Sequence, residues 1–189
     1  MEDIRQLLRQ ETNFNVSDKT IDLLIGNMQA QEIPARTAVI SAGEINTNAY
    51  MVTRGILKMS YLSDGREVTY GFGGPGSFLV SPHSFYMNRP AFMQVETCKT
   101  GAGVLMMTKD CFTEILNSSH EFAEWMFYVA LHQLLACEMK LSVINGTAKE
   151  RYTSLIRNRP EILKYISKKN IASYLGVTPE YLSRISVDL

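Results

Sequence analysis

The sequence predicts an α+β fold in which a β-rich segment lies between two helical ones. Short apolar runs separated by glycine or polar turns fill the region from about residue 33 to 107. A long run after His120 is apolar on every helical face, and the end of the chain matches two short helices joined by a glycine turn. We therefore expect a double-stranded β-helix or jelly roll, a long helix, and a small all-α helix-turn-helix domain.

The first thirty residues carry two short helical patterns. Apolar residues recur at helical spacing, first at Ile4, Leu7 and Leu8 and then at Ile21, Leu24, Ile25 and Met28. From Ile33 the period changes to that of strands, and the expected strands are residues 38–40, 49–52, 56–62, 68–72 and 102–107. Residues 63–66, Ser-Asp-Gly-Arg, lie between two of these runs and predict a hairpin turn.

The helical period returns after Thr108, with candidate helix starts at residues 109–112 and 118–121. Residues 125–131 are apolar on every side, so a helix over about residues 119–144 should be buried on every side. The roll can cover one face only, and a second copy of the chain would cover the other. The residues expected on this dimer helix are Trp125, Val129, His132, Leu135 and Met139.

A hinge is expected at residues 145–147, Asn-Gly-Thr, and divides the chain into two domains. The first domain, residues 1–145, holds the roll and the long helix. The second, residues 146–189, holds the helix-turn-helix.

Residues 168–185 predict the helix-turn-helix in detail. Gly176 can adopt the left-handed conformation that ends a helix, and Val177 is the apolar residue between the two helices. Thr178 is a suitable N-cap, and Pro179 suits the first helical position because its missing N–H would have no partner there. The apolar positions that pack the pair together are Ile171, Ala172, Leu175, Leu182 and Ile185.

The second helix of this pair has polar and aromatic side chains that point outward, namely Glu180, Tyr181, Ser183 and Arg184. A recognition helix presents such a set to base edges and phosphates in the major groove of DNA. The alternative is a plain helical hairpin at the surface, with no nucleic-acid partner.

The distribution of charge favours a DNA partner, although the 19 basic and 19 acidic residues cancel over the chain. Residues 149–185 hold eight basic and three acidic side chains, a net charge of +5, whereas residues 1–148 carry a net charge of −4. A basic module on a mildly acidic body is expected where one part neutralises phosphates.

The order of these elements resembles that of the bacterial Crp/Fnr transcription regulators over nearly the full length of the chain. Gly43-Glu44, Tyr50-Met51-Val52 and Gly55 resemble the start of the family's cyclic-nucleotide-binding roll. Residues 171–185 resemble the family's DNA-reading motif, and residues 148–152 with 159–162 resemble the first helix of its DNA-binding domain.

The resemblance implies roles for individual residues of the reading motif. Glu180 and Arg184 match the family's Glu and Arg that approach base edges, whereas Lys168, Lys169 and Thr178 would contact the DNA backbone. The expected DNA-binding set is Lys168, Lys169, Thr178, Pro179, Glu180, Tyr181, Ser183 and Arg184.

Two features of the roll differ from family members that bind cyclic AMP. Those members hold the phosphate with a Gly-Glu pair and, about ten residues later, with Arg-Ser or Arg-Thr. Here Ser81 and Pro90 stand where the resemblance places the carboxylate and the guanidinium, and only the neighbouring Arg89 offers a charge. Because a sequestered phosphate needs charged partners, we do not expect cyclic AMP to bind.

The sequence leaves open an effector other than cyclic AMP and does not identify it. The residues expected to line an effector pocket are Phe72, Gly76, Phe78, Leu79, Ser81, Arg89 and Ala91. Phe85, Tyr86 and Phe92 could add to its apolar wall. The alternative is that these aromatic side chains simply fill the roll. The cysteine cluster of the oxygen-sensing relatives is absent from the sequence, and no haem site is evident.

Only four residues follow Ile185, so we expect a domain that lacks the full β-hairpin wing of many relatives. The chain begins without an apolar signal segment, and no apolar run reaches the length of a membrane span. The expected location is the cytoplasm, without a membrane partner.

Enzyme and metal chemistry have little support in the sequence. Cys98, Cys111 and Cys137 match no zinc or iron–sulfur spacing, and the three histidines are far apart. The glycine-rich residues 71–76 lack the Lys-Ser/Thr of a phosphate-binding loop. We therefore expect no catalytic residue, no metal and no cofactor.

The expected function is that of a homodimeric, sequence-specific transcription regulator that an effector in the roll controls. Its partners would be double-stranded DNA and a second copy of the chain, and the resemblance allows RNA polymerase as a third. The alternative is a ligand-binding or protein-interaction module of the same fold that does not read DNA.

Overall fold

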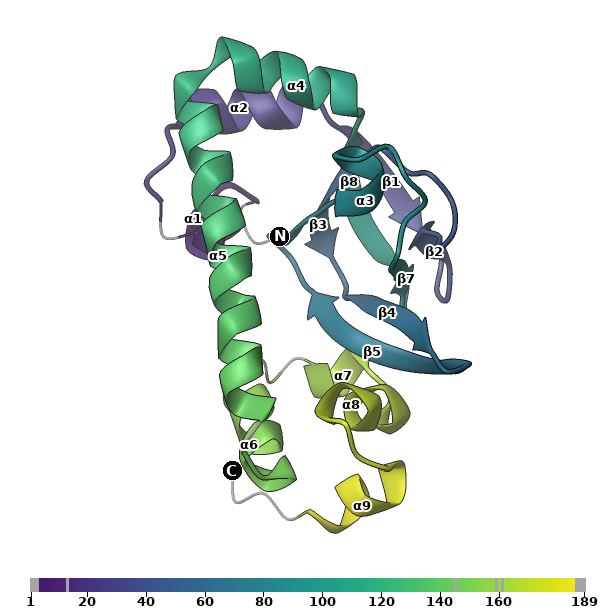
Figure 1. Ribbon diagram of the computed structural model, residues 1–189. Helices are drawn as coiled ribbons and strands as arrows, with labels where there is room; N and C mark the ends of the chain where they lie inside the picture. Colours follow the sequence, from purple (N-terminus) through teal and green to yellow (C-terminus); the bar gives the residue numbers. More distant parts are fainter. Residues whose placement is uncertain (1–3, 13, 145, 159, 161, 186–189) are drawn as a thin grey trace.

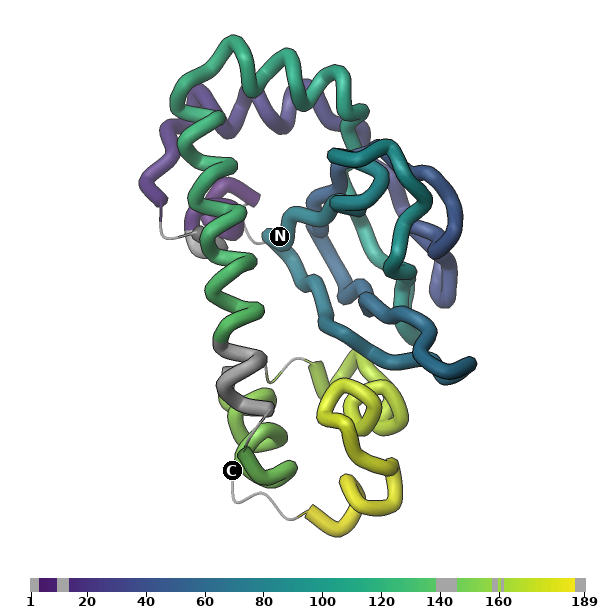
Figure 2. Tube along the Cα trace, in the orientation of Figure 1, coloured from purple at the N-terminus to yellow at the C-terminus, as the bar shows by residue number. Residues whose placement is uncertain are grey.

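The computed structural model describes residues 4–12, 14–144, 146–158, 160 and 162–185, and within these ranges it leaves the side chains of residues 10–12, 139–144 and 158 undescribed. The long helix α5 (His120–Ile144) runs along one side of the molecule, with a β-roll beside its first half (Figure 1). The C-terminal helices lie at the far end of α5, below the roll (Figure 2). The roll therefore contacts both the long helix and the C-terminal helices.

The strands of the roll, in chain order, are β1 (Gln29–Ile33), β2 (Ala38–Ile40), β3 (Ala49–Arg54), β4 (Leu57–Ser63), β5 (Arg66–Gly73), β6 (Phe78–Leu79), β7 (Gln94–Thr97) and β8 (Ala102–Met107). The other helices are α1 (Ile4–Thr12), α2 (Asp18–Gly26), α3 (Pro82–Phe85), α4 (Lys109–Ser118), α6 (Ala148–Asn158), α7 (Ile162–Tyr165), α8 (Lys168–Leu175) and α9 (Pro179–Arg184).

The described strands form two antiparallel sheets, in the orders β1-β8-β3-β6 and β2-β7-β4-β5. A tight turn joins β4 to β5, where Asp64 and Gly65 both have positive φ, 50° and 71°. This is the pair of conformations that a two-residue hairpin turn requires. The register shifts between Met59 and Ser60, so that Tyr70 is an extra residue on β5. β5 thus forms one edge of its sheet and contains a bulge.

Two apolar clusters hold the roll together. The interior between the two sheets is filled by side chains that include Ile40, Val52, Leu57 and Val104. The second cluster joins α5 to α1, α2, α4 and one sheet of the roll, and its residues Phe122 and Trp125 are only 0% and 1% exposed. Phe112 of α4 contacts Phe122 at a ring-centroid distance of 5.4 Å, with the rings edge to face. One face of α5 is therefore part of the core.

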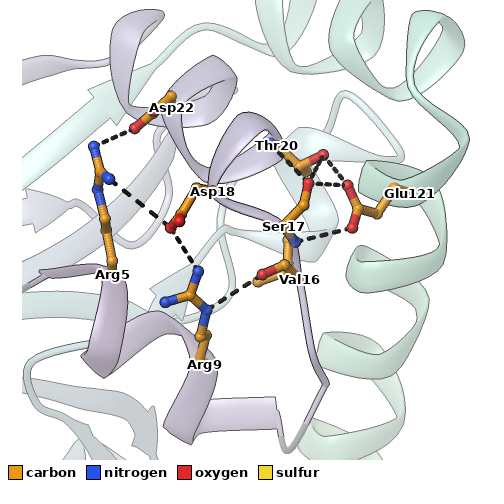
Figure 3. A network of polar contacts seen from close by, with 8 residues as sticks. All are labelled: Arg5, Arg9, Val16, Ser17, Asp18, Thr20, Asp22 and Glu121. Atoms are coloured by element: carbon orange, nitrogen blue, oxygen red, sulfur yellow. Dashed lines mark hydrogen bonds and ion pairs between the residues drawn. The ribbon is translucent and has the colours of Figure 1, made fainter.

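The N-terminal helices fasten the start of α5 through a polar network (Figure 3). Ser17 caps α2 and donates its backbone N–H to Glu121 Oε1 of α5 at 2.9 Å. Glu121 also accepts from the hydroxyls of Ser17 and Thr20. These hydrogen bonds, with the Ser17 hydroxyl contributing most, lower the pKa of Glu121. The carboxylate thus bridges the first turns of α2 and α5.

Two arginines of α1 extend this network to the acidic side chains of α2. Arg5 Nη2 lies 2.6 Å from Asp22 Oδ1, and Arg9 Nη2 lies 2.6 Å from Asp18 Oδ1. Arg9 also donates to the backbone oxygen of Val16. Because these pairs are exposed, they orient α1 against α2 more than they stabilise the fold.

The sequence predicted most of these elements. The expected strands correspond to β2, β3, β4, β5 and β8, and the hairpin turn at residues 63–66 is confirmed. Thr108 caps α4, and the Ser119 hydroxyl accepts from Phe122 N at the start of α5, as the helix-start signals predicted. Of the proposed hinge, Asn145 lies outside the described residues, whereas Thr147 caps α6.

The sequence did not predict β1, β6 and β7, which hold five, two and four residues. One prediction was wrong: Gln29 and Ala30 belong to β1 and not to the preceding helical segment. The pairing of β1 with β8, from Gln29–Met106 to Ile33–Ala102, explains the difference. Such long-range pairing overrides a local helical pattern.

We predict that Phe122→Ala lowers the free energy of unfolding by about 3–5 kcal/mol, because it opens a cavity in the cluster that joins α5 to α4, the N-terminal helices and the roll. Urea unfolding followed by the fluorescence of Trp125 measures this. Tyr86→Ala, at an exposed aromatic side chain, is the control and should cost less than about 0.5 kcal/mol. Equal losses for the two variants would contradict the packing of α5 against the roll.

Candidate nucleic-acid interface

The two helices at the end of the described chain have the local geometry that their sequence predicted. α8 begins at an N-cap, Ser167, and ends at Gly176, whose φ of 69° and ψ of 31° are left-handed. The Thr178 hydroxyl accepts from Tyr181 N at 3.1 Å, and Pro179 occupies the first turn of α9. The predicted caps and turn are therefore confirmed, and they fix the direction in which α9 leaves α8.

The structure leaves the eight expected DNA-binding residues on the surface. Exposed side chains are found at Lys168, Lys169, Thr178, Pro179, Glu180, Tyr181, Ser183 and Arg184. Ser183 donates its hydroxyl proton to the backbone oxygen of Pro179, whereas Leu182 on the opposite face is buried. α9 thus has one buried face and one polar face open to a partner.

An apolar cluster beneath these helices links them to the roll. Ile171, Ala172, Leu175 and Leu182 form its helical part. Ile56 and Cys98 of the roll belong to the same cluster, and burial raises the pKa of the Cys98 thiol to about 11. The C-terminal helices therefore pack directly on the roll of the same chain.

Polar and aromatic contacts join α8 to β5. Thr69 donates its backbone N–H to Ser173 Oγ at 2.9 Å, and the ring centroids of Phe72 and Tyr174 are 5.4 Å apart. This corrects the prediction that Phe72 lines an effector pocket, because its ring packs in the cluster under α8. Because the β-bulge adds Tyr70 to β5, the side chains before and after it do not follow the simple alternation of a regular strand.

A buried lysine beside this contact was not found from the sequence. Lys58 of β4 bonds to Glu67 of β5 and lies 2.8 Å from Glu96 of β7. Burial lowers the pKa of Lys58, but the two carboxylates outweigh this effect and raise it. The hydrogen bond from Lys58 lowers the pKa of Glu67, and the charge of Lys169 adds a smaller effect. Only the pairing of β4 with its two neighbours brings these charges together.

The other expected pocket residues are divided between separate places. Leu79 and Ala91 belong to the interior of the roll, while Phe78 packs in the cluster against α5. The Ser81 hydroxyl caps α3 by accepting from Ser84 N at 3.3 Å, and Arg89 is exposed. Ser84 also donates its hydroxyl proton to the backbone oxygen of Arg89 at 2.8 Å, so α3 links Ser81 to Arg89, and a pocket formed by the whole set stays a prediction.

A small hollow remains between the roll and α5. Gly76, Phe78, Trp125 and His132 are among the residues that line it, and its volume is about 20 Å³. This is room for about one water molecule. Of the expected pocket residues, it brings together only Gly76 and Phe78.

The helix α5 presents different residues to the roll and to the solvent. Trp125 is buried in the core of its own chain and Val129 packs against that core, whereas His132 is exposed and lines the small hollow, and a dimer contact through His132 stays a prediction. Leu135 is exposed, and the side chain of Met139 lies outside the description. The exposed apolar side chains of α5 are Phe127, Tyr128, Leu131, Leu134 and Leu135.

A larger hollow of about 580 Å³ lies along α6 and is open to the solvent. Its lining contains two cations, Lys149 and Arg157, one carboxylate, Glu150, which accepts from Thr147, and the hydroxyls of Thr147, Thr153 and Ser154, so that cations outnumber the carboxylate by one. Such groups suit an anionic partner. The sequence had indicated the charge of this region but not its concave shape.

The described residues contain no group of three or more His, Cys, Asp or Glu side chains arranged to hold a metal ion. Within the same part of the chain, no helix is long and apolar enough to cross a membrane.

Comparisons with known proteins agree with this architecture. Residues 30–119 match the family model of the cyclic nucleotide-binding domain. The search of curated proteins found no match. FixK2 from Bradyrhizobium japonicum has a similar structure, with a TM-score of 0.71 and 18% identity over 84% of this chain and 82% of that chain.

Two further solved structures are similar over most of their length. The c-di-GMP responsive global regulator CLP from Xanthomonas campestris has a TM-score of 0.69 and 17% identity, over 89% of each chain. A protein from Eubacterium rectale, described as a regulator of the Crp/Fnr family, has a TM-score of 0.67 and 17% identity over 90% of this chain and 82% of that chain. The resemblance predicted from the sequence is confirmed at the level of the fold: residues 30–119 match the model of the cyclic nucleotide-binding domain, and the chain has the fold of solved regulators that include one of the Crp/Fnr family.

Proposed function

We propose that the chain is a sequence-specific DNA-binding transcription regulator that acts as a homodimer. The observation that carries this proposal is the surface of α9. Glu180, Tyr181, Ser183 and Arg184 are exposed together on one short helix, while Leu182 fixes its other face to the apolar cluster. A recognition helix in the major groove uses this division of its faces.

The charges around α9 support the same proposal. Lys168 and Lys169 are exposed at the start of α8, and Lys149 and Arg157 face the open hollow along α6. Cations that flank a recognition helix neutralise phosphates and hold the helix in register on the duplex. Glu180 and Arg184 would then read base edges.

The free face of α5 supports a dimer. Phe127, Leu131 and Leu134 follow one another at intervals of four and three residues, and Phe127 and Leu134 are 60% and 57% exposed. This spacing is that of a coiled-coil seam between two helices. A monomer would leave this apolar row in water, and soluble monomers rarely expose large apolar patches. We infer that α5 pairs with the same helix of a second copy.

Control by an effector is the third part of the proposal. A ligand that binds differently to two arrangements of the dimer would re-aim the recognition helices. Because the roll interior is filled and the hollow beside α5 holds about one water, an effector would need to displace side chains there. The regulator CLP, which has a similar fold, responds to c-di-GMP. This response belongs to CLP and does not identify the effector of the present chain.

We predict that Arg184→Ala and the double variant Lys168→Ala/Lys169→Ala weaken DNA binding in different ways. Removing a base contact should cost about 1–3 kcal/mol on the preferred duplex and relax the sequence preference. Removing the two lysines should weaken binding to all duplexes and lower the salt slope by about one per lost phosphate contact. Competition titrations at several salt concentrations measure both effects.

The duplex for these titrations is the sequence that the wild-type chain enriches from a random pool. The control is Lys99→Ala, which removes an exposed lysine of the roll and should leave both quantities unchanged. If Arg184→Ala and the lysine variant changed affinity and sequence preference alike, the separation into reading and backbone residues would be wrong.

We predict that cyclic AMP does not bind with low micromolar affinity. The Ser81 hydroxyl already caps α3, and Pro90 carries no charge. These two positions therefore offer cyclic AMP neither a carboxylate nor a cation. Isothermal calorimetry at 25 °C measures the binding. A low micromolar dissociation constant that Arg89→Ala abolishes would show that Arg89 supplies the missing charge and would contradict this account of the roll.

We predict that Leu134→Glu converts the dimer into a monomer, because it buries two carboxylates in the apolar seam. Sedimentation at micromolar concentration measures the change, and specific DNA binding should fall with it. Leu62→Glu is the matched control, since Leu62 is an exposed leucine at the end of β4. A variant that stays monomeric yet keeps full DNA affinity would disprove the coupling between dimer and DNA binding.

A further inference from the structure

The edge strand β5 contacts both the long helix and the helix pair that carries the DNA-reading surface. Tyr70 Oη lies 3.1 Å from Cys137 Sγ near the end of α5. One residue earlier on the strand, Thr69 N donates to Ser173 Oγ of α8. Within one protomer, consecutive residues of β5 therefore contact both α5 and α8, in addition to the apolar cluster that packs α8 on the roll.

The side chain of Ser173 forms hydrogen bonds to β5 of the kind that a neighbouring strand would form. β5 is the edge of the sheet β2-β7-β4-β5, and an edge strand presents unpaired backbone groups. Ser173 Oγ accepts the N–H of Thr69 at 2.9 Å and lies 3.4 Å from the backbone oxygen of Glu67, to which its hydroxyl can donate. These two backbone groups are two residues apart and point to the same edge. The Ser173 hydroxyl thus pairs with one outward-facing N–H and one outward-facing C=O of the edge strand β5.

The surrounding contacts make this position specific. Phe72 and Tyr174 pack beside the hydrogen bonds, and Thr69 is buried at 3% exposure. Thr69 N–H would therefore lose its partner and stay partly shielded from water if α8 kept its place without the Ser173 hydroxyl. Such a loss favours undocking of the helix pair.

The docked position leaves the reading surface free. The polar side chains of α9, including Glu180 and Arg184, are exposed while α8 contacts β5. Docking therefore does not block the surface that would meet DNA. It fixes the direction of α9 relative to α5, and hence relative to the axis of the proposed dimer.

The direction of α9 should affect the affinity for a duplex with two half-sites but not the affinity for a duplex with one. A dimer that reads a palindrome needs its two recognition helices about 34 Å apart on the same face of the duplex. A single half-site, like non-specific DNA, requires no such separation, because one module contacts it alone. A residue that orients α9 should therefore affect the palindrome more than the half-site.

We propose that Ser173 is a positioning residue for DNA recognition, which docks the reading helices on the edge of β5 and so sets their spacing in the dimer. This inference rests on the proposed function. It adds that the roll and the reading helices are joined by a direct contact as well as by the hinge.

The test compares Ser173→Ala with the wild-type full-length chain by two measurements. Hydrogen exchange of the peptide that covers residues 66–73 reports docking without DNA, and exchange should be faster in the variant. Titrations then compare a palindromic duplex enriched by the wild-type chain with a duplex that carries one of its half-sites. The ratio of the two affinities should fall about fivefold, the effect of losing one hydrogen bond. Ser173→Thr, which keeps the hydroxyl, should restore both readouts.

Ser167→Ala is the matched control. It removes a serine hydroxyl that accepts a backbone N–H on the same helix, because Ser167 Oγ accepts from Asn170 N at 3.2 Å, but it does not touch β5. This variant should lower both affinities equally and leave the affinity ratio unchanged.

Three results would overturn the inference. Unchanged exchange at β5 in Ser173→Ala would show that the hydroxyl does not hold the docked arrangement. Faster exchange with an unchanged affinity ratio would show that docking does not set the spacing. A wild-type chain that binds no duplex would overturn the proposed function and the positioning role together, and a faster exchange in the variant would then assign the contact to folding alone.

Discussion

The packing of one face of α5 into the core that it shares with α1, α2, α4 and the roll is the constraint on which the rest of the structure depends. Phe122 and Trp125 are fully buried there, so the helix cannot rotate about its axis without losing this core. The orientation of α5 about its axis in turn decides which side chains face the solvent, and it leaves Phe127, Leu131 and Leu134 exposed as a row. It also brings the last turns of α5 next to β5, where Cys137 meets Tyr70.

Each end of α5 is held by a different kind of contact. At its start, Glu121 accepts from Ser17 and Thr20 of the N-terminal segment, so polar groups fix the helix where it enters the core. Towards its end, Cys137 contacts Tyr70 of β5, and the C-terminal helices rest on the roll through α8. A change in the roll can therefore reach α8 and α9 by two routes, through α5 and through β5. This arrangement has the physical connection that coupling between an effector and DNA would need.

The sequence predicted those features that local chemistry decides. Gly176, Thr178 and Pro179 specify a turn and a cap without help from distant residues, and the structure places all three as expected. The turn at Asp64 and Gly65 is another case, because few residues tolerate positive φ. The apolar residues 125–131 were likewise predicted to be helical, and the structure places them in α5 with Trp125 buried in the core and Phe127 and Leu131 exposed.

Features that depend on long-range pairing could not be predicted in this way. Phe72 was assigned to a pocket because aromatic residues were counted without knowing their direction, and the bulge on β5 and the docking of α8 decide that direction. The same holds for Trp125 and Val129, since a helix that is apolar all round gives no sign of which face meets the roll. Lys58 joins Glu67 and Glu96 only because β4 pairs with both of their strands.

The most direct test of the central claim, that two copies of this chain read DNA together, is the enrichment of duplexes from a random pool, followed by sequencing. The account predicts one enriched motif with two-fold symmetry, whose half-sites are centred about 10 base pairs, or one helical turn, apart. Enrichment that yields no motif, or a motif without two-fold symmetry, would contradict it.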